Sequence, residues 1–363
     1  MKTTKQRAAR MQNQQIPALD GLRGIAALIV VISHLSNQVD FRYTGFGAGQ
    51  IGVMIFFALS GFLMCHVTHN VQLSPASAWN FFVKRFARVV PLFVFVVLFS
   101  YFTYGRQIFG VTFQFYGMGD WDTVLHHLTL RKGYSVLWTI PVELFFYALF
   151  PVYWAISSRG WAVWAVLALL IIQVLFVIPW YEALSEQHDD AVPTFLRLFS
   201  RLQYFLVGIL AYRFCRSEMK NLDAVFIFSA SLILLCYPQI YKSLTDTPAM
   251  VWRNESLMLL VFLLLLSASN SSLANKVLGG PVMRHLGDIS YSVYLTHVPV
   301  MLVVTQLVDT GTPVLFVSLV LAGTLAVSEV TFRFLEKPSR RAITNRTLKA
   351  GARRLPAQSD RPV

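Results

Sequence analysis

The sequence is poor in charge and in cysteine, and both shortages exclude classes of protein. Only 13% of its 363 residues are charged, whereas soluble domains usually carry about a quarter. Its three cysteines, Cys65, Cys215 and Cys236, are odd in number and form neither a Cys-x-x-Cys pair nor a zinc-type spacing. The adjacent His126 and His127 cannot face one ligand from a helix. We therefore expect no soluble fold, no disulfide framework and no metal site.

Two further features of membrane and secreted proteins are missing from the sequence. There is no internal repeat, and no pair of corresponding interrupted helices occurs in two halves of the chain, as an inverted-repeat transporter would show. The first apolar run follows a basic lead, residues 1–16, but no clear small-residue cleavage site follows that run. We interpret the run as a retained transmembrane helix and not as a signal peptide.

Long apolar runs are abundant instead, because 55% of the residues are hydrophobic. A run of about 20 apolar residues is long enough to cross a bilayer as a helix. This pattern predicts an all-α, polytopic integral membrane protein with about ten transmembrane helices. The predicted spans cover residues 22–38, 50–68, 89–105, 136–156, 160–180, 199–213, 222–241, 254–270, 289–308 and 313–333.

The net charge of +13 is explained better by membrane topology than by nucleic-acid binding. The basic residues lie mainly at the two ends and in short connectors, which is the pattern of cytoplasmic segments. The tail, residues 337–363, holds eight basic residues and one acid. We expect both termini to be cytoplasmic, with a transmembrane domain over 1–336 and a basic, disordered tail over 337–363 that contacts anionic lipid.

Two costly polar side chains, Arg23 and His34, lie in the first span, eleven positions apart. On a helix they fall on one stripe, about 16 Å apart along the axis, with Ala27 and Val30 between them. The stripe predicts a narrow groove for a long, thin ligand that is anionic at one end and reactive at the other. The alternatives are a headgroup anchor for Arg23 and an interhelical hydrogen bond for His34.

The segment NFFVKRFARVVP places Arg85 and Arg88 on one helical face, beside the membrane. Two guanidinium groups in this arrangement can bind the oxygens of a phosphate. The segment therefore predicts a phosphate clamp, and the alternative is a second cytoplasmic anchor.

Glu143 lies within a span, in the segment SVLWTIPVELFFYALFP. An unpaired carboxylate in lipid costs several kcal/mol, so it must be protonated, paired or placed in a wet cavity. Trp138, Thr139 and Tyr147 are close in sequence and are candidates to line such a cavity. The alternative is a structural pair with a cation of another helix.

Two more segments interrupt the apolar pattern. Ser60 and Gly61 lie in mid-span, and small residues there favour close helix packing. Tyr294 and His297 share a face of the ninth span. They are candidates either for an acceptor site or for interhelical hydrogen bonds and an interfacial aromatic belt.

Taken together, these segments resemble the membrane acyltransferase-3 family, the O-acyltransferases of the O-antigen and exopolysaccharide acetylase type. The family's Arg-x10-His signature falls on Arg23 and His34, and its Arg-x-x-Arg motif falls on Arg85 and Arg88. The similarity extends over about residues 17–341 and implies a fold of about ten helices. The other similar segments are GVMIFFALSGFLM, LWTIPVELFFY with Trp138 and Glu143, ISYSVYLTHVPV and FRFLEKPSRR.

The resemblance implies transfer of an acyl group, acetyl by family default, from cytoplasmic acyl-CoA to a hydroxyl of a cell-surface glycan or glycolipid. On this hypothesis Arg23, Arg85 and Arg88 bind the CoA phosphates. His34 is the general base, since an imidazole exchanges protons near neutral pH. Glu143 is a second catalytic residue that orients His34 or balances its charge.

The hypothesis leaves several points open. Trp138, Tyr294 and His297 are assigned to the acceptor substrate, and a covalent acyl-histidine relay is an alternative to direct transfer. The rival classes are a transporter or flippase and a structural or sensory membrane protein. We expect a multi-pass protein of the bacterial inner membrane, with membrane lipid and a glycan as partners, no nucleic acid and no appended SGNH-type domain.

Overall fold

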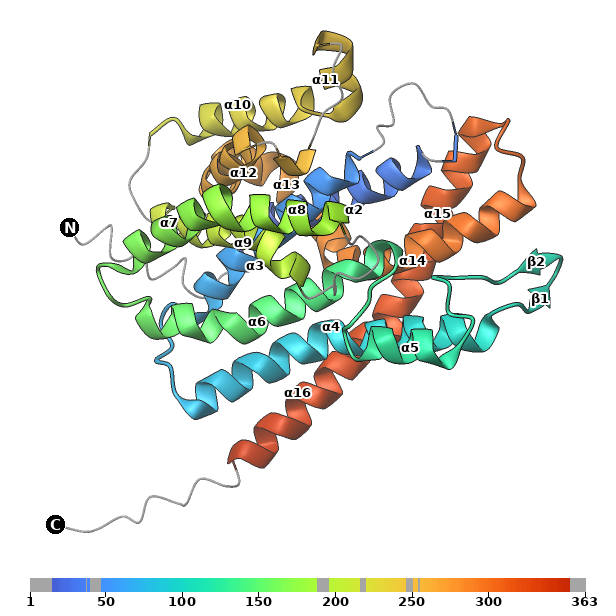
Figure 1. Ribbon diagram of the computed structural model, residues 1–363, viewed down its shortest axis with the longest axis horizontal. Helices are drawn as coiled ribbons and strands as arrows, with labels where there is room; N and C mark the ends of the chain where they lie inside the picture. The colour runs from blue at the N-terminus through green and yellow to red at the C-terminus, as the bar shows by residue number, and fades with distance from the viewer. Residues whose placement is uncertain are drawn as a thin grey trace.

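The computed structural model describes residues 15–36, 38, 39, 47–187, 196–215, 220–245, 251–253 and 255–352. This part of the chain is almost entirely helical (Figure 1). The exception is a short antiparallel hairpin of β1 (Gln107–Ile108) and β2 (Val111–Thr112). Most of the predicted basic lead and the last part of the tail lie outside the described residues.

The described residues of the first half of the chain contain five long helical runs joined by shorter elements. Pro75 and Pro17 stand at the first turn of their helices, where a missing N–H has no cost. The elements are α2 (Pro17–Leu35), α3 (Gly49–Thr68), α4 (Pro75–Thr103), α5 (Trp121–Leu128), η1 (Ser135–Trp138), α6 (Thr139–Ile156), α7 (Ala162–Ile172), η2 (Gln173–Val177) and α8 (Ile178–Gln187).

The second half is likewise helical, and its last elements form one long run. The elements are α9 (Arg197–Phe214), α10 (Leu222–Leu235), α11 (Pro238–Thr245), η4 (Val251–Arg253), α12 (Glu255–Ala268), α13 (Ser272–Leu278), α14 (Pro281–Leu307), α15 (Pro313–Thr331), η5 (Phe332–Glu336) and α16 (Lys337–Ala352). Both η2 and η5 are π-helical segments, a rare form that often marks functional sites.

The helices agree with the predicted spans in position. Each of the ten predicted ranges overlaps a helix or a continuous helical run. Within the described residues, six helices are long and apolar enough to cross a membrane, and a seventh is added if Ser256–Ala268 and Ser272–Leu278, bent by 92°, form one span. The chain is therefore an all-α, multi-pass membrane protein, and the count of ten crossings stays a prediction.

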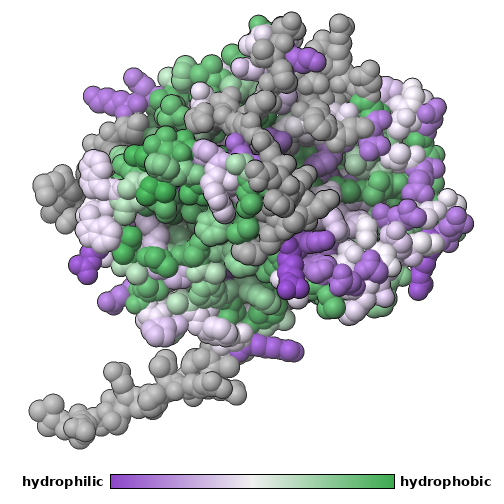
Figure 2. Space-filling model, in the orientation of Figure 1, coloured by the Kyte–Doolittle hydropathy of each residue, from purple (hydrophilic) through white to green (hydrophobic). Residues whose placement is uncertain are grey.

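The outer surface of the helical body is apolar, as a lipid-facing surface must be. Figure 2 shows apolar side chains gathered over the left half of this face, with hydrophilic side chains at its edges and in its lower right part. On the run α7–η2–α8, Trp164 and Phe176 are 70% and 66% exposed. Side chains of this size are exposed in such number only where lipid or a partner covers them.

Helix α2 lies between α3 and α14, and glycines bring the three backbones close together. A Cβ on Gly287 would lie 2.0 Å from the carbonyl oxygen of Asp20, and one on Gly52 would lie 2.5 Å from that of Ala26. Small residues allow this approach in membrane helices. The contact fixes the α2 side chains against α14.

Three of the helical runs are longer than a bilayer requires. The run Pro313–Thr347 has 35 residues and so measures about 52 Å, whereas the hydrocarbon core is about 30 Å thick. Helices α4 and α14, with 29 and 27 residues, also exceed the core thickness. A helix of this length either tilts in the bilayer or extends beyond it.

The predicted disordered tail differs from the structure over much of its length. Residues Lys337–Ala352 form α16, which continues the helical run from α15 and packs along α4 (Figure 1). The segment has no face that packs into a core, so its sequence lacks apolar periodicity. Its helix is stabilised by continuity with the preceding helical run and by the contact with α4. Residues 353–363 lie outside the described residues.

The expected close packing at Gly61 is confirmed. A Cβ on Gly61 of α3 would lie 2.1 Å from the Phe205 carbonyl oxygen of α9, and one on Gly208 would lie 1.9 Å from that of Ala58. The two helices thus contact each other through glycines on both sides.

We expect Gly61→Ala to destabilise the protein by about 1–3 kcal/mol, because the added methyl group must push two backbones apart. The measurement is the midpoint of thermal unfolding in detergent. Gly160→Ala is the matched control, since nothing lies within 4 Å of a Cβ at that position. Equal midpoints for both variants would contradict the role of Gly61 in packing.

Candidate active site

A narrow inner cavity of about 60 Å³ lies among α2, α3, α4, α6 and α14. Phe56, Phe57 and Leu63 of α3 form much of its apolar wall. Its polar lining consists of Arg23, Ser60, Arg85, Arg88, Thr139, Glu143, Tyr147, Ser290, Tyr291 and Tyr294. A narrow space with polar groups at defined points suits an extended ligand.

A second, larger cleft of about 1030 Å³ adjoins the inner cavity. The two share four lining residues, Arg23, Leu63, Arg85 and Arg88. The cleft is bounded by the first turns of α2 and α14, the end of α3, the first half of α4 and the run η5–α16. These are the helix ends that the distribution of basic residues in the sequence predicts on the cytoplasmic side.

Three arginines stand where the cleft meets the inner cavity. The guanidinium group of Arg23 lies 3.8 Å from the Asp20 carboxylate. Within the described residues, the buried Nε of Arg85 has no hydrogen-bond partner, although its guanidinium lies 5.7 Å from the centre of the Phe81 ring. A buried donor without a partner is costly, so this junction is suited to an anionic ligand.

Glu143 faces the inner cavity and is held by two hydroxyl groups. The Ser60 hydroxyl donates to its carboxylate at 3.0 Å, and the Tyr147 hydroxyl also donates to it. Thr139 and Tyr147 line the same cavity, so the expectation that these two neighbours of Glu143 line a cavity is confirmed. Ser60 therefore has a polar contact in addition to its place in close packing.

His34 contacts a second histidine, His297 of α14. Nδ1 of His34 lies 2.9 Å from the Val30 carbonyl oxygen and 3.3 Å from Nε2 of His297. Nδ1 of His297 lies 3.2 Å from the Val293 carbonyl oxygen. The ring centres are 5.0 Å apart. Glu143, which the sequence suggested as the partner of His34, binds Ser60 and Tyr147 instead.

This geometry selects one tautomer for each histidine. A carbonyl oxygen can only accept a hydrogen bond, so Nδ1 carries the proton in both rings. Nε2 of His297 then accepts from Nδ1 of His34. Nε2 of His34 is left unprotonated and, among the described residues, has no hydrogen-bond partner. An imidazole nitrogen in this state is able to accept a proton.

The histidine pair lies behind one wall of the inner cavity. Tyr294 lines the cavity, and its ring centre is 6.1 Å from that of His297 and 5.9 Å from that of Phe56. Neither His34 nor His297 lines the cavity or the cleft. The rings of Phe56 and Tyr294 therefore stand between the cavity and the histidines.

The groove expected along the stripe from Arg23 to His34 is closed. Ala27 and Val30 are only 0% and 1% exposed, and neither lines the inner cavity. Helix α3 packs against this part of α2 through Gly52. The open space runs beside the stripe, along α3, α6 and α14.

Trp138 stands next to the cavity and outside its lining. Its ring contacts those of Phe57 and Trp252, at 6.1 Å and 6.0 Å between centres, and the guanidinium of Arg197 lies 5.5 Å from its ring centre. Of these residues only Phe57 lines the inner cavity. A role for Trp138 in binding the acceptor stays a prediction.

Several lining residues were not predicted from the sequence. On the cleft these include Glu336, Lys337 and Arg340. The basic composition of the segment after residue 336 was visible, but without apolar periodicity it gave no sign of a helix. Acidic residues near the first turns of helices are also common on solvated surfaces.

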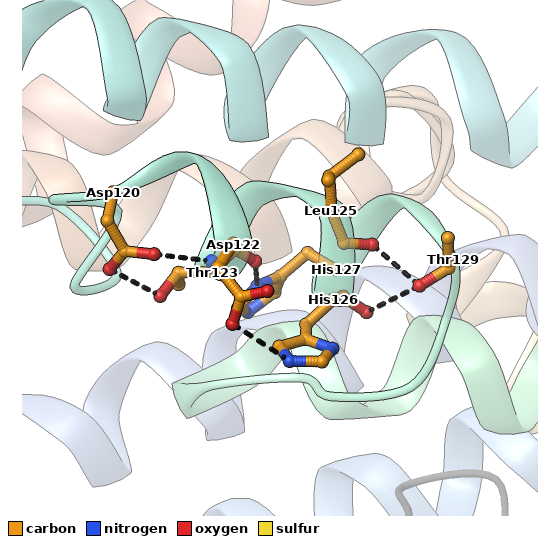
Figure 3. Close-up of polar contacts among 7 residues, drawn as sticks. All are labelled: Asp120, Asp122, Thr123, Leu125, His126, His127 and Thr129. Carbon is orange, nitrogen blue, oxygen red and sulfur yellow. Dashed lines mark hydrogen bonds and ion pairs between the residues drawn. The ribbon is translucent and has the colours of Figure 1, made fainter.

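The two adjacent histidines of α5 have structural partners (Figure 3). His126 Nε2 lies 3.0 Å from the Asp122 carboxylate. His127 Nδ1 donates to the Thr123 carbonyl oxygen at 2.8 Å, and His127 Nε2 accepts from the Tyr134 N–H at 3.1 Å. His127 is fully buried. Both of its nitrogens are thus in use in the neutral form.

We expect the stability of the region around α5 to fall as the pH is lowered below 6.5. Burial lowers the pKa of His127 from its ordinary value of 6.5, so below this pH the unfolded chain binds a proton that the folded chain does not. The loss is up to about 1.4 kcal/mol per pH unit until the folded-state pKa is reached. Unfolding midpoints between pH 7.5 and 5.5 measure it. A His127→Gln variant that loses as much stability as wild type over this range would contradict the assignment.

Comparisons with known proteins agree with this architecture. The acyltransferase domain of the acyltransferase-3 family matches residues 16–333. The peptidoglycan O-acetyltransferase OatA of Listeria monocytogenes is 23% identical over 92% of this chain and 57% of its own length. A Bacillus subtilis protein named "Putative peptidoglycan O-acetyltransferase YrhL" is 26% identical over 90% of this chain and 55% of its own. No solved structure matches the chain.

The chain belongs to the acyltransferase-3 family, since the family's domain matches most of its length. It spans rather more than half the length of the curated relatives given above. Four of the residues that carry the family resemblance, Arg23, Arg85, Arg88 and Glu143, line one cavity, and Trp138 stands next to it. His34 lies behind the wall of that cavity.

Proposed function

We propose that the protein is a membrane O-acyltransferase that moves an acyl group, by family resemblance an acetyl group, from cytoplasmic acyl-CoA to a hydroxyl of a cell-envelope glycan. We further propose that it lies in the bacterial cytoplasmic membrane with both termini inside. The relatives named above support a cell-wall glycan as the acceptor class.

One observation carries the proposal: a wide basic cleft adjoins a narrow cavity, and the two share three lining arginines. An acyl-CoA has the matching shape, with a phosphorylated nucleotide at one end and a thin pantetheine arm ending in a thioester. Phosphates bind well to guanidinium groups. The cavity then directs the thioester toward Tyr294 and the histidine pair behind it.

The proposed reaction uses Nε2 of His34 as the general base. It takes the proton of the acceptor hydroxyl while that oxygen attacks the thioester carbonyl carbon. The tetrahedral intermediate then breaks its bond to sulfur, and the departing thiolate takes the proton from the imidazolium ring of His34. His297 and the Val30 carbonyl hold the imidazole in the tautomer that leaves Nε2 free.

The Phe56 and Tyr294 rings give this reaction a steric requirement. The thioester must pass them to reach His34, so we propose that these rings change position when donor and acceptor are both bound. An acyl-histidine relay has the same steric requirement. In that mechanism the acyl group is bonded to His34 while it moves from the donor to the acceptor. We assign Trp138, Tyr294 and His297 to binding of the acceptor.

The direct test of function is transfer from acetyl-CoA labelled in the acetyl group, with purified protein in vesicles and envelope glycan as acceptor. We expect label to appear in the glycan fraction as a base-labile ester only when the protein is present. Label that stays on CoA, or labelled donor that crosses the vesicle membrane unchanged, would contradict the proposal. The second of these results would favour a transporter.

A further inference from the structure

The run η5–α16 forms part of the wall of the basic cleft. Arg333, Lys337 and Arg340 all line it. The run continues from the membrane helix α15 and packs along α4, which carries Arg85 and Arg88 (Figure 1). Cations of the C-terminal run and of α4 thus face one space, although more than 240 positions separate them in the sequence.

A buried acid fixes this run against α14. Glu336 of η5 is only 3% exposed, and its carboxylate accepts from the Ser292 hydroxyl at 2.9 Å. The contact sets the position of the π-helical segment from which α16 continues. Lys337 and Arg340 follow one and four residues after that anchor, which is about one helical turn. Their place on the cleft wall is therefore built into the fold.

The cations of the cleft fall into two groups by their partners. Arg23 lies near Asp20, and Arg333 is paired with Glu329. Within the described residues, the structure gives no ion pair to four others, which are Arg85, Arg88, Lys337 and Arg340. An acyl-CoA carries two phosphorylated positions, a pyrophosphate next to the pantetheine arm and a 3′-phosphate on the ribose.

The two pairs of cations lie at different depths between the cleft and the inner cavity. Arg85 and Arg88 line both the cleft and the inner cavity, whereas Lys337 and Arg340 line the cleft alone. The pantetheine arm must enter the narrow cavity, so the pyrophosphate attached to it lies at the shared arginines. The 3′-phosphate is then left within the wider cleft.

We propose that Lys337 and Arg340 form a subsite for the 3′-phosphate of the acyl-CoA donor, so that α16 distinguishes CoA from nucleotides without this group. The inference rests on the proposed function. The same two cations could bind the phosphate of an anionic lipid headgroup. Their position on the wall of a cleft shared with Arg85 and Arg88 favours the nucleotide.

The test compares the dissociation constants of CoA and 3′-dephospho-CoA for the purified, full-length protein in neutral detergent. We expect wild type to bind CoA about 10- to 100-fold more tightly, as for a charge-assisted contact. Arg340→Gln should remove most of this preference by weakening CoA binding alone. Arg340→Lys should recover part of it.

The matched control is Arg341→Gln, which removes the neighbouring cation of the same helix from a position outside the cleft lining. It should leave both dissociation constants unchanged. Unchanged thermal unfolding midpoints would show that the variants are folded. If α16 cannot tolerate Arg340→Gln, the comparison of the two ligands on wild type still tests the subsite.

Three results would overturn the inference. Wild type could bind CoA and 3′-dephospho-CoA equally, or Arg340→Gln could weaken both ligands by the same factor. Alternatively, Arg340→Gln could lower binding of the protein to phosphatidylglycerol nanodiscs and leave the preference for CoA intact, which would assign the site to lipid. These results leave the proposed function standing, whereas wild type that binds neither nucleotide overturns both.

Discussion

Replacing His34 with alanine is expected to lower acetyl transfer by at least about 100-fold, and up to about 10,000-fold, because the reaction loses its general base. CoA affinity should stay the same, since His34 does not line the cleft or the cavity. The measurements are the rate of ester formation on glycan and the dissociation constant of CoA. His34→Asn, which keeps an amide near the Val30 carbonyl but supplies no base, should be equally inactive.

The control for this experiment is His126→Ala, which removes a partly exposed histidine of α5 whose partner is Asp122. This variant should transfer acetyl groups at the wild-type rate. Retention of wild-type turnover by His34→Ala would show that another group accepts the proton. A labelled protein adduct that forms in wild type and is absent from His34→Ala would favour the acyl-histidine relay.

Replacing Arg88 or Arg85 with glutamine is expected to weaken CoA binding by about 10- to 100-fold each. A hydrogen bond to a charged group contributes about 1.5–3 kcal/mol, and each 1.4 kcal/mol is a factor of ten in the dissociation constant. Both arginines lie at the junction of the cleft and the cavity. The maximal rate at saturating acetyl-CoA should fall much less, because neither residue contacts the reacting atoms.

Lys84→Gln provides the matched control, because Lys84 is an exposed cation of the same helix and lines neither space. Its CoA affinity should equal that of wild type. If Lys84→Gln weakened binding as much as the two arginine variants, a general effect of positive charge would explain the result. Unchanged affinity in Arg85→Gln and Arg88→Gln would move the phosphate site elsewhere.

Much of the fold could be predicted because lipid imposes a simple pattern on the sequence. Runs of about 20 apolar residues are legible without any tertiary information, and each predicted range overlaps a helix. Contacts within one helix were also accessible. Thr139 and Tyr147 line the cavity with Glu143, as their closeness in the sequence suggested.

Contacts between distant helices could not be predicted in the same way. His34 and His297 meet across 263 positions, and their individual positions in apolar runs give no sign that they are partners. The stripe on α2 was expected to form a narrow apolar groove with Ala27 and Val30 in its middle, yet Gly52 lets α3 close it. Small residues favour both outcomes, and the neighbouring helix decides between them.

For the C-terminal helix α16 the prediction was wrong in another way: the sequence indicated disorder, and the structure is helical. Its charge was visible, and a basic segment without apolar periodicity is typical of disorder. The structure continues it as a helix because α15 and η5 carry the helical backbone onward and Glu336 anchors it to Ser292. A single buried acid thus places two cations on the cleft, and nothing local in the sequence distinguishes that acid from a solvated one.

The most direct test of the account is a structure of the protein in lipid nanodiscs with a non-hydrolysable acetyl-CoA analogue. We predict the nucleotide in the cleft, the pyrophosphate at Arg85 and Arg88, and the pantetheine arm in the inner cavity with its acyl end toward Tyr294. An analogue bound on the lipid-facing surface, or a nucleotide in the cleft with its arm directed away from the cavity, would contradict the account.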